Sequence, residues 1–189
     1  MQGFSLIEVL IVTSITLTVA GVAVPKMINS IANLELRSAV HSASGVIQQT
    51  RMQAIKGDKA LKAKYWNGTG GGFVFADSND NGTPESTEPQ AQLGSAVLAY
   101  SAPTAIPALT STDLGYSTVT TTSVQFSATG QPCTVVTGVM SSSTICPVGM
   151  VMYFTDTRSM GSPGWAAVSV APAGRVACWM WDGTKWAQN

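Results

Sequence analysis

The side chains best placed to do chemistry lie in the segment DSNDNGTPESTE, residues 77–88. Four of them carry oxygen ligands at the spacing D-x-N-x-N-G-x₅-E, and these are Asp77, Asn79, Asn81 and Glu88. Calcium takes about six to eight oxygen ligands, with a glycine at the sharp bend of the loop and a carboxylate late in it. Gly82 occupies the bend, so the segment is a candidate Ca²⁺ site, and calcium is the one cofactor that the sequence suggests.

The same segment also fits a loop without metal. A strand-like stretch precedes it, and Pro84 and Pro89 obstruct the helix that would follow an EF-hand loop. Asn and Asp side chains hydrogen-bond to nearby backbone and so stabilise tight turns. A structural turn is therefore the favoured interpretation, and calcium is the alternative.

The three cysteines, Cys133, Cys146 and Cys178, include no CxxC pair, so a zinc site has no support. Cys133 and Cys146 flank a loop rich in Ser, Thr and Gly, and we expect a local disulfide to close it. Two other pairings stay open, and each pairing leaves one thiol over. Cys178 lies in a strand-like stretch, where burial is enough to explain it. Disulfides suit an oxidising compartment outside the cytoplasm.

Residues suited to catalysis or to strong nucleic-acid binding are scarce. Charged residues make up 11% of the chain, and ten basic residues balance ten acidic ones, so gross attraction to nucleic acid is not expected. His41 is the single histidine, and no nucleophile–base pair is visible, so we predict that the chain is not an enzyme. Lys59, Lys62 and Lys64 stand beside aromatic residues, as in single-strand binders, but a solvated helix end is the favoured interpretation.

The chain begins with an apolar run at residues 4–24, FSLIEVLIVTSITLTVAGVAV. About 20 helical residues span the ~30 Å hydrocarbon core of a membrane. Glu8 lies inside the run, where a carboxylate costs roughly 2.5–3.5 kcal/mol on insertion scales. An ordinary signal peptide or anchor is the alternative interpretation, but neither has a use for that cost. Glu8 is therefore a candidate functional residue.

The octapeptide GFSLIEVL, residues 3–10, resembles the class III signal of type IV pilins and type II secretion pseudopilins. The resemblance implies that a prepilin peptidase cleaves between Gly3 and Phe4 and that the new Phe4 amine is N-methylated. Residues 1–3 are then the leader, and Glu8 is the fifth mature residue. We expect Glu8 to meet a Phe4 amine, of its own chain or of a neighbouring subunit, during filament assembly. An unpaired buried charge is strongly penalised, so Glu8 would select correctly placed subunits.

A proline and a second apolar pattern follow the run. Pro25 predicts a kink, and apolar residues at helical spacing over residues 26–56 predict a further helical half that stops at Gly57. From residue 67 onward, short runs rich in Val, Thr, Tyr and Phe predict antiparallel strands. The expected fold is α+β and pilin-like, with a transmembrane half-helix at residues 4–24, a periplasmic half-helix at 25–57 and a β-sheet head at 58–189.

Two motifs of the head resemble the FimT/GspH branch of the same family. One is the phrase F-x-D-x-N-x-N-G followed by Glu, which begins at Phe75. The other is AGRVAC, residues 173–178, which is similar to a G-R-x-R-x-C strand that belongs to a DNA-binding face in DNA-uptake members. Arg175 matches the first arginine of that strand, but Ala177 replaces the second. Because each phosphate contact by Lys or Arg adds to affinity, DNA is a less favoured partner.

The favoured function is that of a structural subunit, a minor pilin or pseudopilin of a type IV pilus or a type II secretion pseudopilus. The resemblance implies three kinds of partner: other pilin or pseudopilin subunits, the prepilin peptidase and the inner-membrane assembly platform. It also implies a single-pass protein of the bacterial inner membrane, with its head in the periplasm and later in a filament. The alternative is a FimT-like minor pilin that binds DNA for natural transformation through a face that includes Arg175.

Overall fold

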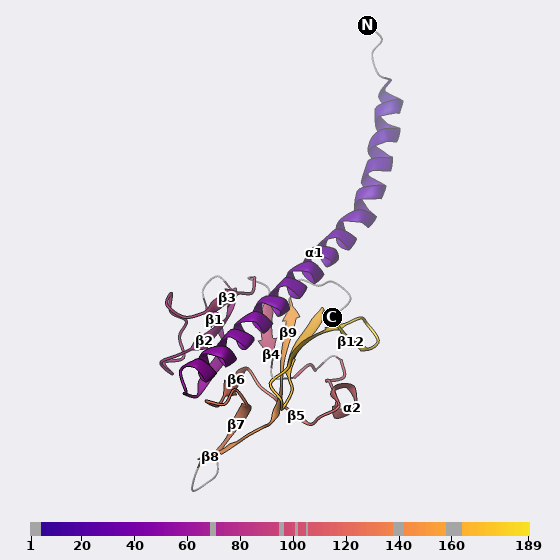
Figure 1. Ribbon diagram of the computed structural model, residues 1–189. Coiled ribbons are helices and arrows are strands. Elements are labelled where there is room, and N and C mark those ends of the chain that lie inside the picture. The colour runs from indigo at the N-terminus through magenta and orange to yellow at the C-terminus, as the bar shows by residue number, and fades with distance from the viewer. Residues whose placement is uncertain are drawn as a thin grey trace.

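A computed structural model describes residues 5–68, 71–94, 97–100, 102–104, 106–137, 142–157 and 164–189. A long helix, α1 (Leu6–Lys56), leads into a β-rich head. Figure 1 shows that the N-terminal part of α1 reaches away from the head, while its C-terminal part lies against it. We call residues 6–28 of this helix, which are all exposed, the free half, and residues 29–56 the packed half.

The packed half of α1 is explained by small apolar side chains at helical spacing. The buried apolar residues of the helix are Ala32, Leu36, Ala39, Val40, Ala43, Val46, Ile47 and Ala54. Residues three and four apart share one face of a helix, so this stripe faces the head. The helix ends at Gly57, whose N–H donates to the Gln53 carbonyl at 2.8 Å, and this is the stop that the sequence predicts.

The described part of the head contains two sheets. The first has the order β3-β2-β1-β6-β7-β8, formed by Gln90–Gln92, Gly71–Asp77, Leu61–Gly68, Ser123–Phe126, Pro132–Thr137 and Ser142–Ile145. The second has the order β12-β11-β10-β9-β4, formed by Trp186–Gln188, Val176–Trp181, Trp165–Val170, Gly149–Asp156 and Val97–Tyr100. Neighbours in both orders pair antiparallel, whereas β5 (Thr118–Thr120) pairs with β9 in parallel.

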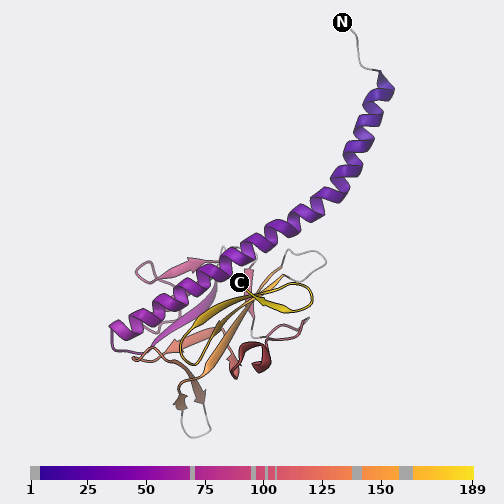
Figure 2. The ribbon, with the colours of Figure 1, turned by 45° about the vertical axis from the view of Figure 1, so that its right-hand side comes forward.

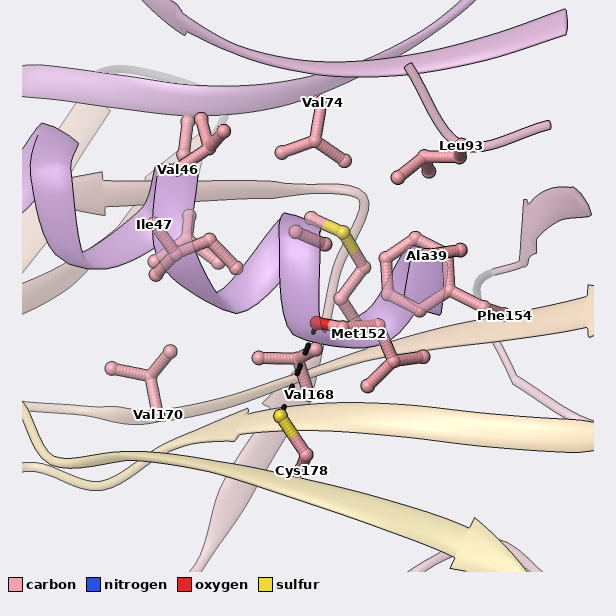
Figure 3. Close-up of a cluster of buried hydrophobic side chains, with 14 of the residues drawn as sticks. Ala39, Val46, Ile47, Val74, Leu93, Met152, Phe154, Val168, Val170 and Cys178 are labelled. Atoms are coloured by element: carbon pink, nitrogen blue, oxygen red, sulfur yellow. Dashed lines mark hydrogen bonds between the residues drawn. The ribbon is translucent and has the colours of Figure 1, made fainter. Parts of the chain in front are cut away.

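The main core lies between α1 and the two sheets, because the helix contacts strands of both. Figure 2 shows the helix crossing the head along one side. In Figure 3, Ile47 of α1 lies near Val170, Met152 and Phe154 come from β9, and the Cys178 thiol points at the helix. That thiol donates to the Val40 carbonyl at 3.9 Å, and burial raises its pKa, so it stays protonated.

The opposite face of the second sheet carries a smaller cluster, which includes Tyr153 and Trp165. Trp186 packs on its edge, with ring centroids 5.8 Å from Tyr153 and 5.6 Å from Trp181. The indole N–H of Trp186 donates to the Pro107 carbonyl at 2.9 Å. These aromatic side chains are thus used for packing, as aromatic residues commonly are.

The expected fold class is confirmed: a long N-terminal helix precedes antiparallel sheets.

One local prediction is wrong. The segment with Lys62 and Lys64 is strand β1 and not a solvated helix end. Leu61 and Ala63 alternate with the two lysines and are buried against the core, so the period of two overrides the local helical context. The sequence reasoning also missed α2 (Ser111–Leu114), a single turn with a capping box between Thr110 and Asp113.

Candidate functional site

The free half of α1 is the first candidate site, because it exposes an apolar surface that the chain itself does not cover. Residues 5–28 are all exposed, and Leu6 and Leu10 keep 83% and 57% of their surface. Within the described residues, α1 is the one helix whose length and composition would allow it to cross a membrane. The most apolar window of α1 has no residue buried against the head. Such a surface requires lipid or other apolar helices around it.

Four hydroxyl groups in this half donate to carbonyls of the helix itself. Thr13 and Ser14 donate to the Leu10 carbonyl at 3.0 and 2.9 Å. Thr16 and Thr18 donate to carbonyls one turn back, at 2.8 Å each. Polar groups that bond inside their own segment are compatible with hydrocarbon, since no water is needed there. These residues therefore do not interrupt the apolar surface.

Glu8 is the exception in the free half. It is exposed in the first turn of α1, and its carboxylate forms no hydrogen bond or ion pair with any described residue. Its backbone N–H donates to the carbonyl of Ser5, the N-cap residue, at 3.0 Å. Gly3 and Phe4, the predicted cleavage and methylation residues, lie outside the described residues. The partner that we expect for Glu8, a Phe4 amine of its own chain or of a neighbouring subunit, therefore lies outside the described residues.

Pro25 lies inside α1, which continues through it as a helix. A proline removes one backbone hydrogen bond and its ring crowds the carbonyl four residues earlier, here that of Gly21. In both views α1 is bent between its free half and its packed half (Figures 1 and 2). Pro25, where the sequence predicts a kink, belongs to the free half, close to its boundary with the packed half.

The loop at residues 77–88 is the second candidate site, and the side chain of its first residue, Asp77, accepts three of its hydrogen bonds. The Asp77 side chain has no exposed surface. Its Oδ2 accepts from the Lys64 ammonium at 2.6 Å and from the Gly82 N–H at 3.0 Å. Its Oδ1 accepts from the Asn81 N–H at 3.1 Å. Both carboxylate oxygens are thus engaged by donors of the chain itself.

Lys64 joins the loop to β1. Its ammonium also bonds to Asp80 Oδ1 at 3.2 Å, and Lys62 bonds to the same carboxylate at 2.7 Å. Burial alone would lower the pKa of Lys64, but the hydrogen bonds to Asp77 and Asp80 outweigh it and raise the pKa. The hydrogen bonds from Lys62 and Lys64 lower the pKa of Asp80. Lys64 is therefore charged at neutral pH and acts as a cation within the loop.

The remaining candidate ligands are also turned toward N–H groups. Asn79 Oδ1 accepts from the Asn81 N–H at 3.1 Å, and Asn81 Oδ1 accepts from the Thr83 N–H at 2.9 Å. Glu88 accepts from the N–H groups of Ser78 and Glu85, at 2.7 and 3.3 Å. No group of three or more acidic, histidine or cysteine side chains among the described residues is arranged to hold a metal. In this conformation the candidate ligand oxygens accept hydrogen bonds from the chain itself, and calcium, the less favoured alternative, stays a prediction to be tested.

Cys133 and Cys146 form a disulfide in the structure, and Cys178 is a free, buried thiol. The disulfide joins β7 to the residue that follows β8, next to the pair Thr134 and Ile145, so the segment that it closes is the pair of strands β7 and β8 itself. A covalent link across a short hairpin restricts the unfolded chain and stabilises the fold.

Arg175 is exposed just before β11, and it lines a shallow pocket of about 180 Å³ together with Ala177 and Asp113. Arg175 is the one basic side chain among the described residues that line this pocket. The DNA-binding prediction therefore rests on Arg175, with an acidic side chain at the same pocket. Asp113 itself has a lowered pKa, since it accepts hydrogen bonds from Thr110, and is ionised at neutral pH.

Arg51 is a residue whose role the sequence reasoning missed. From the packed half of α1 it donates to the carbonyls of Gly130, Gly174 and Ala173, at 2.9, 3.0 and 3.2 Å. It thereby ties the β6–β7 turn and the β10–β11 turn to the helix. The partners lie 79 and more residues away in the chain, so no local pattern points to them. For Lys64 a signal did exist, namely the alternation in the segment LKAKY.

Comparisons with known proteins give one similarity of fold. No protein-family model matches the chain, and no curated protein matches it. Among solved structures, the chain is similar to the crystal structure of the type IV minor pilin FimU from Pseudomonas aeruginosa strain PAO1. The two are 15% identical over 82% of this chain and 94% of the FimU chain, with a TM-score of 0.44.

Proposed function

We propose that the chain is a minor pilin or pseudopilin, a structural subunit that is held in the inner membrane and then assembles into a filament. The observation that carries the proposal is the free half of α1. It is apolar, wholly exposed and continuous with a helix that packs on the head. A helix of this kind suits a subunit that leaves lipid to enter a bundle of like helices, because both surroundings cover the same surface.

The motif GFSLIEVL supports the same function at its start. In the proposed pathway a prepilin peptidase removes residues 1–3 and methylates the amine of Phe4. Residues 4–24 anchor the subunit, residues 25–57 continue the helix in the periplasm, and residues 58–189 form the head. The assembly platform of the inner membrane and other pilin-like subunits are the expected partners.

Glu8 supplies the selection step of this proposal. Its carboxylate is without a described partner in the isolated chain and lies in the most apolar part of the helix. A neighbouring subunit would bring its Phe4 amine to this carboxylate. Such a pair adds little net stability, but a missing partner leaves a buried charge, which is strongly unfavourable. Misplaced subunits are therefore rejected more than correct ones are attracted.

Mass spectrometry of the chain purified from its native bacterium tests the proposal. We expect a mature chain that begins at Phe4 and carries a methyl group on its amine. The matched control is the same chain from cells without prepilin peptidase, which should retain residues 1–3. A chain that begins elsewhere in the peptidase-positive cells would refute the proposed processing and with it the function.

A further inference from the structure

The loop at residues 77–88 has the oxygen spacing of a calcium loop, yet a lysine from a neighbouring strand lies in its centre. Asp77, Asn79 and Asn81 stand at the first, third and fifth positions, and Gly82 takes the bend. A calcium ion in such a loop would draw the side-chain oxygens together around itself, at about 2.3–2.6 Å. In the structure the Asp77 carboxylate lies 2.6 Å from the Lys64 ammonium instead.

The strand register brings Lys64 into the loop. β1 and β2 pair so that Lys62 stands opposite Asp77, and Lys64 is two residues further along the same face of the sheet. A Cβ built on Gly82 would lie 3.9 Å from Lys64 Nζ, so the ammonium is next to the sharp bend. Lys64 Nζ thus lies among Asp77, Asp80 and Gly82, where the pattern expects a divalent cation.

The charges explain why a cation is needed there. The Asp77 side chain is fully buried, and the Lys64 side chain keeps only 24% of its surface. A buried carboxylate without a compensating charge is strongly destabilising. An ammonium has three N–H donors, and here they reach Asp77 and Asp80. One lysine therefore supplies the positive charge that a metal ion would otherwise provide, and its hydrogen bonds take the place of metal–oxygen coordination.

We propose that the Lys64 ammonium is a built-in replacement for calcium in the loop at residues 77–88. The wild-type loop keeps its folded conformation without a metal ion. Removal of the Lys64 ammonium converts it into a loop that binds calcium. This inference concerns the head alone and does not depend on the proposed function.

The first experiment compares wild type with Lys64→Met, each as the full chain in detergent. Thermal unfolding is followed by tryptophan fluorescence in excess chelator and in calcium at about 10 mM, well above the ~1 mM constants of weak extracellular calcium modules. We expect the unfolding midpoint of wild type to be the same in chelator and in calcium. In chelator the midpoint of Lys64→Met should lie several degrees below that of wild type. Calcium should restore this midpoint, because a ligand bound by the native state raises stability. Sodium chloride of equal ionic strength should not restore it.

Two further variants separate this proposal from an ordinary ion pair. Lys62→Met is the matched control, since its partner Asp80 is 63% exposed, and it should change little under any condition. The double variant Lys64→Met with Asp77→Asn removes the buried charge and should not respond to calcium. A wild-type midpoint that rises in calcium would overturn the proposal. So would a Lys64→Met protein that calcium does not stabilise, including one that fails to fold when produced in calcium.

Discussion

The two halves of α1 differ in the side chains they carry, although they form one continuous helix. The free half is built from large side chains on all sides, and Leu6, Ile15 and Leu17 keep 59% or more of their surface. The packed half buries one stripe of apolar residues, where small alanines such as Ala39 and Ala43 lie against the head, while Leu34 and Met52 outside the stripe stay exposed. The free half therefore has no preferred face, while the packed half has one.

This difference indicates that one helix serves two surroundings. A helix that is apolar all round requires an apolar environment on every side, such as lipid or a bundle of helices. A helix with one stripe requires one partner, and small side chains let it approach that partner closely. In the proposed subunit the packed half holds the head in a fixed position on the helix, and the free half remains available for the membrane and for other subunits.

The largest expected effect separates assembly from folding. Glu8→Ala should abolish entry into filaments in the native bacterium, since the proposed pairing with a neighbouring amine is lost. Membrane insertion and the thermal midpoint of the head should be unchanged, because Glu8 touches no described residue of the head. Filament content is measured by immunoblotting of sheared filaments. Thr13→Ala in the same half serves as the control, and normal assembly of Glu8→Ala would show that the charge has no such role.

The next prediction tests whether the head depends on the packed half alone. Leu36 has no exposed surface, so Leu36→Ala should destabilise the head by about 2–5 kcal/mol through lost burial and a cavity. Leu10→Ala removes the same atoms from a residue that is 57% exposed in the free half. It should leave the midpoint of tryptophan fluorescence unchanged in detergent. Equal losses in the two variants would mean that both halves stabilise the head.

A smaller effect is expected where Arg51 of the packed half holds the β10–β11 turn. Gly174 has a φ of +81°, and an added Cβ would lie 2.5 Å from Arg51 Cζ. Gly174→Ala should therefore cost about 1–3 kcal/mol, through backbone strain and displacement of the guanidinium. Gly183→Ala shares the positive φ but meets nothing within 4 Å, so it should show the strain alone. If the two variants unfold at one temperature, the Arg51 contacts contribute nothing measurable.

The halves of α1 and the fold class could be predicted from the sequence because each rests on a local pattern. Helical spacing over residues 26–56 and the apolar run before Pro25 are visible without any contact information. The contacts of Arg51 and Lys64 could not be predicted in this way, because they depend on residues distant in the sequence. Arg51 reaches turns far along the chain, and the role of Lys64 depends on how β1 pairs with β2. The loop spacing pointed to a cation, but its source became visible only in the sheet register.

The smallest expected effect sharpens the comparison most, because it applies one substitution to both halves of one helix. Gly45 and Gly21 both lie in α1, and an added Cβ would meet nothing within 4 Å at either position. Alanine is the better helix former by about 0.5–1 kcal/mol, so Gly45→Ala should raise the midpoint of the head by a few degrees. Gly21→Ala should leave it unchanged, since the free half does not unfold together with the head. A rise of the same size in both variants would show that α1 unfolds as a single unit, and the division into two halves would then hold for packing but not for stability.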